Sequence, residues 1–169
     1  MKIKDMCLCS LFAILIGVGA FIKIPISIVP VTLQTLFVVL AALLLKKNAV
    51  VSVALYIVIG LLGVPVFTGG GGIAYVLMPS FGYLLGFIVC AVIVGNRKDE
   101  HYLLLRCILG MLVIYVIGVF YFILIEYFYY HKIFTFSYLI VSLFLVYIPG
   151  DLLSIVVAIL AYKRLKAFI

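Results

Sequence analysis

The chain has 169 residues, of which 69% are hydrophobic and only 10% are charged, and its formal net charge at pH 7 is +7. A mean hydropathy of +1.51 excludes a water-soluble globular domain and predicts a protein of the lipid bilayer. The length accommodates six spans of about 20 residues, and no linker rich in Ser, Pro or charge divides it. We therefore expect one domain, residues 1–169, of the all-α class: a polytopic membrane protein with six transmembrane helices.

Charges and clusters of Gly and Pro mark the boundaries of the predicted spans. All should be helical, because lipid offers backbone N–H and C=O groups no partner. The first apolar run follows two lysines and ends in Gly-Val-Gly-Ala, as a cleaved signal peptide can. A retained span is favoured, because the run is longer than a usual signal core and the rest of the chain stays membrane-bound. In chain order, the predicted spans are 6–22, 24–45, 48–63, 79–95, 102–125 and 138–162.

The basic residues predict the orientation in the membrane. Only Lys23 and Lys132 fall on one side of a six-span weave. This positive-inside bias places both termini and the connections at 46–47 and 96–101 in the cytoplasm. The charges are spread over short pieces without an aromatic stacking platform, so we expect no nucleic-acid partner. The residues on the cytoplasmic side are Lys2, Lys4, Lys46, Lys47, Arg97, Lys98, Arg106, Lys163, Arg164 and Lys166.

Residues suited to catalysis or metal binding are scarce. The four cysteines form no C-x-x-C pair and are interpreted as core filler. His101 and His131 lie near opposite membrane faces in this topology, so they cannot share a metal. Glu126 and Asp151 are the only acidic residues away from the cytoplasmic edge, and no nucleophile accompanies them with a base. We therefore predict no metal site, no cofactor and no enzymatic activity.

The segment 23–30, KIPISIVP, precedes a helix that we expect to begin near Val31. The distance from there to Leu45 is about 22 Å along a helix, which is shorter than the hydrocarbon core. Some proline-broken backbone is thus expected at membrane depth, shielded by protein or by a water-filled cavity. Gln34 in this helix offers both a donor and an acceptor. It either contacts a ligand or serves helix capping and interhelical hydrogen bonding.

The stretch 64–75, VPVFTGGGGIAY, forms the connection between the third and fourth predicted spans. No charged residue occurs from Asn48 to Asn96, whereas an ordinary extracellular loop would be polar. We interpret this stretch as a lid that folds back against the helices, with a flexible connection as the alternative. A phosphate-binding loop is excluded, because no Lys-Ser or Lys-Thr follows the glycines and no strand precedes them.

Asp151 lies in the middle of the last apolar segment, behind a Pro-Gly break. A carboxylate at the bilayer centre costs about 2.5–3.5 kcal/mol on insertion scales, so it should face the bundle interior or a wet cavity. Helical spacing places Tyr147, Ser154 and Ala158 on the same face. A ligand anchor is favoured over a proton relay, because relays usually show a second buried ionisable group. A structural hydrogen-bonding role is the third alternative.

At these three features the chain resembles the BioY family, the biotin-specific S components of energy-coupling-factor (ECF) transporters. The resemblance rests on VPVTLQTLFVVLAALLL, GLLGVPVFTGGGGIAYVLMPSFGYLLGF and PGDLL, which occur in the family's order. It implies a cavity that captures biotin from outside the cell, with lids from the loops after the first and third helices. It also implies transfer inward through a transmembrane coupling subunit and an ATPase pair, in the plasma membrane of a prokaryote.

The resemblance also implies roles for individual residues. Gln34 and Asp151 become polar contacts to the ureido ring of biotin. The first helix is expected to present a small-residue face to the coupling subunit, although packing within the chain would explain the same spacing. The predicted substrate site consists of Gln34, Phe67, Thr68, Gly69, Gly70, Tyr75, Asp151 and Ser154, and the predicted partner face consists of Cys9, Ala13 and Gly17.

Two departures from the family pattern concern the solute. The family motif reads PGD-x-x-K, whereas Ser154 stands here at the position of the lysine, and the glycine run is one residue short of GG-x-GG. The carboxylate of biotin then binds more weakly or finds another partner, such as Lys23. An S component for another vitamin or a biotin derivative, and a membrane scaffold without a ligand, are the alternative hypotheses.

Overall fold

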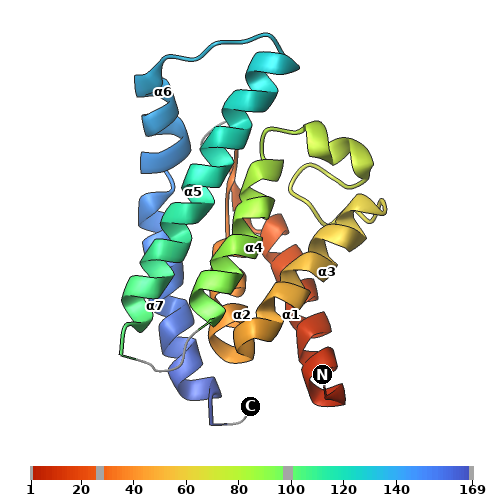
Figure 1. Cartoon of the computed structure of the whole chain (residues 1–169), viewed down its shortest axis with the longest axis vertical. Helices are drawn as coiled ribbons and strands as arrows, with labels where there is room; N and C mark the ends of the chain where they lie inside the picture. The colour runs from red at the N-terminus through yellow and green to blue at the C-terminus, as the bar shows by residue number, and fades with distance from the viewer. Residues whose placement is uncertain (1, 26–28, 97–100, 168–169) are drawn as a thin grey trace.

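The computed structural model describes residues 2–25, 29–96 and 101–167, which form a bundle of helices (Figure 1). The chain runs back and forth along the bundle, and short irregular segments join consecutive helices. The helices are α1 (Ile3–Phe21), α2 (Gln34–Leu45), α3 (Ala49–Leu61), α4 (Phe81–Gly95), α5 (Leu103–Phe128), α6 (Phe136–Ile140) and α7 (Ile148–Leu165). The shorter elements are β1 (Lys23–Ile24), β2 (Val31–Thr32), η1 (Lys46–Asn48), η2 (Ile73–Leu77) and the π-helical η3 (Val141–Leu145).

Four stretches are long and apolar enough to cross a bilayer: Ile3–Phe21, Gln34–Leu61, Leu103–Phe128 and Ser137–Leu165. The second of these is divided by Lys46, whose φ of 54° ends α2 before α3 begins. Helix α4 is apolar but has only 15 residues. The protein is therefore a mainly helical, multi-pass membrane protein.

The segment before α2 differs from the sequence-based expectation. Strands β1 and β2 pair antiparallel, with Lys23 opposite Thr32 and Ile24 opposite Val31, so the described backbone before α2 is non-helical, as expected, but includes a short ladder that was not predicted. Helix α2 begins at Gln34 rather than near Val31. Pro30 lacks an N–H and disfavours helical backbone before it. The residues directly after it, Val31 and Thr32, pair with β1 instead of starting α2. Residues 26–28 of the predicted segment lie outside the described residues.

Helix α2 occupies the centre of the bundle, where it packs against α1, α4 and α7. Its residues Val38 to Leu43 are buried. Helices α4 and α5 approach closely because glycines face the partner helix. A Cβ atom at Gly86 would lie 2.8 Å from the Cα atom of Ile114, which is too short for a normal contact.

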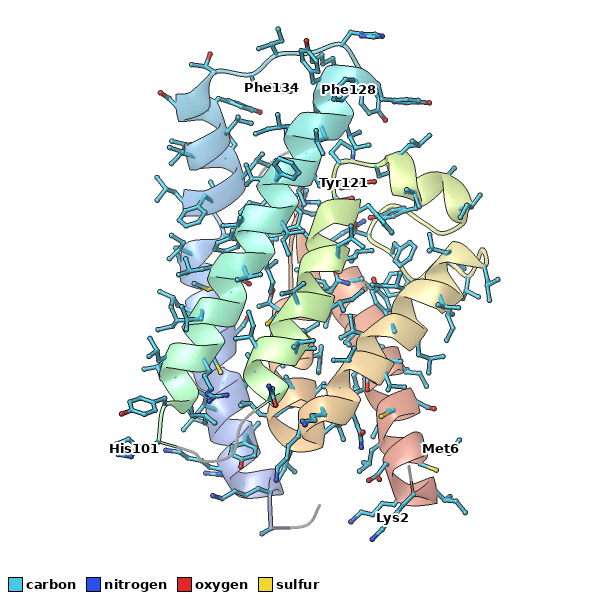
Figure 2. All side chains as sticks on the ribbon, in the orientation of Figure 1. Lys2, Met6, His101, Tyr121, Phe128 and Phe134 are labelled. Carbon is cyan, nitrogen blue, oxygen red and sulfur yellow. The ribbon has the colours of Figure 1, made fainter. Side chains whose placement is uncertain are left out.

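The two ends of the bundle differ in character. The start of α1 and the end of α7 lie at the same end in Figure 1. Lys2 and His101 lie at this end in Figure 2, whereas Phe128 and Phe134 lie at the opposite end. The connection predicted at 96–101 lies mostly outside the described residues. We call the end that carries Phe128 and Phe134 the outer end.

Gly86→Ala is expected to destabilise the protein, because the new methyl group meets the backbone of α5 and forces the two helices apart. The expected loss of unfolding free energy is about 1–3 kcal/mol. Thermal unfolding of the purified protein in detergent measures this change. Val92→Ala, on the exposed face of α4, is the matched control and should leave the Tm nearly unchanged. Equal Tm values for both variants would contradict close packing at Gly86.

Candidate functional site

Two segments are called the outer connections: the first joins α1 to α2 and the second joins α3 to α4. A small cavity of about 40 Å³ lies where their described residues meet α2, α4, α5 and α7. Its volume suits a few water molecules. Most of the lining surface is apolar, with Leu84, Phe87 and Ile114 on the helices and Val29 and Pro30 on the first connection. The polar lining residues are Thr32, Gln34, Thr35, Thr68, Tyr75, Ser80, Tyr83, Tyr115, Tyr147 and Asp151.

Asp151 is the only charged residue in this lining, among the described residues, and its side chain is 6% exposed. The Tyr115 hydroxyl donates to Asp151 Oδ2 at 2.6 Å, and the Thr35 hydroxyl also donates to this carboxylate. Pro149, near the start of α7, places Asp151 in the first helical turn. The helix dipole favours a carboxylate there. The predicted anchor residue therefore faces the bundle interior, where hydrogen bonds compensate its burial.

A cluster of tyrosines surrounds Asp151. The rings of Tyr115 and Tyr147 lie 6.3 Å apart, and those of Tyr83 and Tyr147 lie 6.0 Å apart. The Tyr83 hydroxyl donates to the carbonyl oxygen of Leu143 at 3.2 Å. Sequence reasoning did not select Tyr83 or Tyr115. The available signal was a hydroxyl group within an apolar span, which needs a partner when it is buried.

Gln34, at the first position of α2, connects three parts of the site. Its Nε2 atom donates to the Tyr56 hydroxyl at 2.7 Å, and its Oε1 atom accepts from the Thr32 hydroxyl at 3.2 Å. The Tyr56 hydroxyl donates in turn to the carbonyl oxygen of Val66 at 3.2 Å. Gln34 is therefore buried and lines the cavity, and its amide also supports the connection after α3.

The uncharged connection between α3 and α4 folds back onto the bundle, as its sequence predicts. Phe67 and Tyr75 are buried. The Phe67 ring lies 5.4 Å from the Tyr56 ring and 4.4 Å from the Tyr75 ring. Gly70, at φ 120°, allows the tight turn in which Phe67 and Gly70 pair through their backbones. We call residues 64–80 the outer lid.

Hydroxyl groups of the outer lid run along one wall of the cavity. The Tyr75 hydroxyl shares hydrogen bonds with the Thr68 hydroxyl at 2.9 Å and with the Ser80 hydroxyl at 3.0 Å. The Lys23 ammonium donates to the carbonyl oxygen of Thr68 at 2.6 Å. This last bond joins the first connection to the outer lid.

Tyrosine hydroxyls also hold backbone carbonyls of both connections. Tyr147, at the start of α7, donates to the carbonyl oxygen of Val29. Tyr121, on α5, donates to the carbonyl oxygen of Val76 in the outer lid. Each connection is thus fixed by a side chain from the helix bundle.

The remaining predicted residues lie outside the cavity lining. Phe67 packs behind Tyr75, and Gly69 and Gly70 shape the turn of the outer lid. Ser154 is buried about one turn beyond Asp151 on α7. Their participation in ligand binding stays a prediction.

The small-residue face of α1 packs against other parts of the same protein. Cys9 and Ala13 are buried, and the Cys9 thiol donates to the carbonyl oxygen of Asn48 at 3.4 Å. A Cβ atom at Gly17 would lie 3.6 Å from Val66 Cβ. Packing within the chain, the alternative explanation, therefore accounts for this spacing. Contact of these three residues with a coupling subunit stays a prediction.

Together these groups offer contacts that suit a small polar solute with an apolar body. The carboxylate accepts N–H donors, the amide and hydroxyl groups pair with a carbonyl group, and the apolar wall covers the rest. Pockets for such ligands usually measure about 300–1,000 Å³, so the present cavity is contracted. A solute of that size therefore needs more space than this cavity provides.

Comparison with known proteins gives consistent matches. The model of the BioY family matches residues 1–169. A probable biotin transporter BioY from Lysinibacillus sphaericus is 48% identical over 118 residues, which are 65% of this chain and 60% of that protein. The biotin transporter BioY from Thermotoga maritima is 39% identical over 163 residues, which are 93% of this chain and 92% of that protein.

A solved structure is also similar. It is the crystal structure of the S-component for biotin from an ECF-type ABC transporter, with a TM-score of 0.80 and 26% sequence identity. The match covers 98% of this chain and 92% of that chain. The likeness therefore extends over nearly the whole fold, including the helices that line the cavity.

Tyr115→Phe is expected to lower the stability of the protein, because Asp151 loses its 2.6 Å donor while staying buried. The expected loss is about 1–3 kcal/mol, measured as a lower Tm in detergent. Tyr127→Phe, at an exposed tyrosine of the same helix, is the control and should leave the Tm unchanged. A double variant with Asp151→Asn should lose less than the sum of the single variants, since the two groups interact directly. Additive losses would contradict the coupling.

Proposed function

Because the chain belongs to the BioY family, we propose that it is the biotin-binding S component of an ECF-type vitamin uptake transporter. The observation that carries this proposal is the buried Asp151 carboxylate, which lines a cavity enclosed by the two outer connections. In an apolar bundle such a group is expected at a functional site. The similarity of nearly the whole chain to the S-component for biotin supports the same conclusion.

The chemistry of biotin fits the groups around the cavity. Its ureido ring presents two N–H donors and one carbonyl acceptor. Asp151 can accept from the N–H groups, and the Gln34 amide, which uses one of its two N–H groups on Tyr56, can donate the other to the carbonyl oxygen. Leu84, Phe87 and the rest of the apolar wall suit the sulfur-containing ring and the alkyl chain.

The residues of the outer lid complete the proposed binding site. Thr68 and Tyr75 line the cavity and would contact the solute, while Phe67, Gly69 and Gly70 set the shape of the lid. Ser154 would approach the solute only in a widened cavity. Closure of the lid over biotin would exclude water and strengthen the polar contacts.

We further propose that residues 1–169 act as one unit with six spans and both termini in the cytoplasm of a prokaryotic cell. The common end of α1 and α7, together with the lysines there, supports this orientation. A coupling subunit and an ATPase pair would supply the energy, since the chain carries no phosphate-binding loop motif of its own.

The proposal predicts saturable equilibrium binding of biotin to the purified, detergent-solubilised protein. Asp151→Asn should weaken this binding about tenfold or more, because a charged acceptor is replaced by a neutral amide. Ser154→Lys should strengthen it only where the carboxylate of the solute lies on the Asp151 side of the cavity, because the added cation stands about one turn beyond Asp151. Tyr127→Phe, at an exposed tyrosine far from the cavity lining, is the control. Titration with labelled biotin measures all four proteins.

Absence of biotin binding in the unmodified protein would refute the biotin proposal. Ser154 favours one alternative, an S component for a biotin derivative, because no cation stands at this position. Displacement of biotin by its methyl ester at lower concentration than by biotin itself would favour that alternative. A scaffold protein would bind neither ligand.

The orientation can be tested by cysteine labelling in intact cells. Cys7→Ser removes the exposed thiol, because Cys9, Cys90 and Cys107 are buried. In that background, Lys132→Cys should react with a membrane-impermeant maleimide. Lys47→Cys should react only after permeabilisation. The reverse pattern would contradict the proposed orientation.

A further inference from the structure

The proposed solute carries a carboxylate, yet the cavity offers no positive charge to pair with it. In the part of the chain that the structure describes, the lining residues include no Lys, Arg or His. Their one charged side chain, Asp151, is an acid. A carboxylate on the solute is therefore repelled from the Asp151 side and has to point elsewhere.

Lys23 lies at the rim of this cavity. Two independent contacts place it there: its ladder partner in β2 is Thr32, and its ammonium donates to the carbonyl oxygen of Thr68 at 2.6 Å. Both Thr32 and Thr68 line the cavity. The β1–β2 ladder fixes the backbone of Lys23, and the hydrogen bond to Thr68 directs its exposed side chain toward the outer lid.

Among the described residues, no hydrogen bond shown by the structure joins another basic side chain to the cavity lining. Lys2 lies at the far end of the bundle (Figure 2), and Lys132 follows the end of α5 in the chain. The backbone N–H of Lys132 donates to the carbonyl oxygen of Glu126, outside the lining. Lys23 is thus the basic residue placed to meet a solute in the cavity.

We propose that the Lys23 ammonium binds the carboxylate of the solute at the mouth of the cavity. This inference rests on the proposed function. The ring system lies against Asp151 and Gln34, and the alkyl chain directs the carboxylate outward to Lys23. The two opposite charges thereby fix the direction in which the solute lies.

Binding would exchange one hydrogen-bond acceptor for another. Without solute, Lys23 donates to a neutral carbonyl oxygen of the outer lid. A carboxylate is the stronger acceptor for an ammonium group, with roughly twice the strength of a neutral one. The same residue therefore joins the two connections when the cavity is contracted and recognises the solute when the cavity is occupied.

The test compares biotin with its methyl ester, which keeps the ring and the alkyl chain but carries no charge. Equilibrium binding of both ligands is measured with the purified full chain and with Lys23→Gln, Lys23→Glu and Lys23→Arg. Lys23→Gln should raise the Kd for biotin about tenfold more than the Kd for the ester. Lys23→Glu should weaken biotin further by repulsion, and Lys23→Arg should bind biotin as the unmodified protein does.

Lys132→Gln, at a lysine beyond α5 that does not line the cavity, is the control for a general effect of surface charge and should bind both ligands normally. Equal weakening of both ligands in Lys23→Gln would overturn the inference and leave Lys23 as a link between the connections alone. Unchanged binding of both ligands would overturn it as well. If the unmodified protein binds neither ligand, the proposed function fails, and this inference fails with it.

Discussion

Backbone carbonyl groups that lie outside helices need hydrogen-bond donors within an apolar bundle, and this requirement shapes the outer end of the protein. The first connection satisfies part of it through the β1–β2 ladder. Tyrosine hydroxyls from the bundle donate to three further carbonyls, at Val29, Val66 and Val76. Lipid offers no alternative donor. The two connections are therefore drawn onto the helices, and the space between them becomes an enclosed site rather than an open vestibule.

The buried carboxylate imposes the second requirement, and the tyrosines meet it too. Tyr115 donates to Asp151, and Tyr147, one turn before it on the chain, holds the first connection. Tyr115, which compensates the charge of Asp151, and Tyr147, which holds the first connection, are thus neighbours. A cavity of about 40 Å³ results, far below the size of a vitamin. Ligand capture must consequently exchange internal hydrogen bonds for contacts with the solute, so measured affinity reports only the difference between the two sets.

The sequence predicted the membrane class, most helix positions, the inward orientation of Asp151 and the folded-back connection after α3. These rest on composition, hydropathy and the cost of a buried charge, which are local properties of the chain. The ladder before α2 was not predicted, because the pairing of Lys23 with Thr32 depends on a tertiary contact across two prolines. The roles of Tyr83 and Tyr115 were also missed, since a single tyrosine in an apolar span does not reveal its partner. The small residues of α1 show the same limit, because their spacing alone does not distinguish an internal neighbour from an external one.

The tethers of the two connections end on main-chain oxygen atoms. Val29, Val66 and Val76 can each be replaced by another residue without removing the acceptor that its tyrosine requires. The side chains of these three valines are therefore not needed for these hydrogen bonds. Substitutions there can accumulate, and with them the surface offered to a solute can diversify, while the tyrosines preserve the closed architecture. The solute specificity of such a protein can therefore change during evolution while the hydrogen bonds that hold the connections against the bundle stay the same.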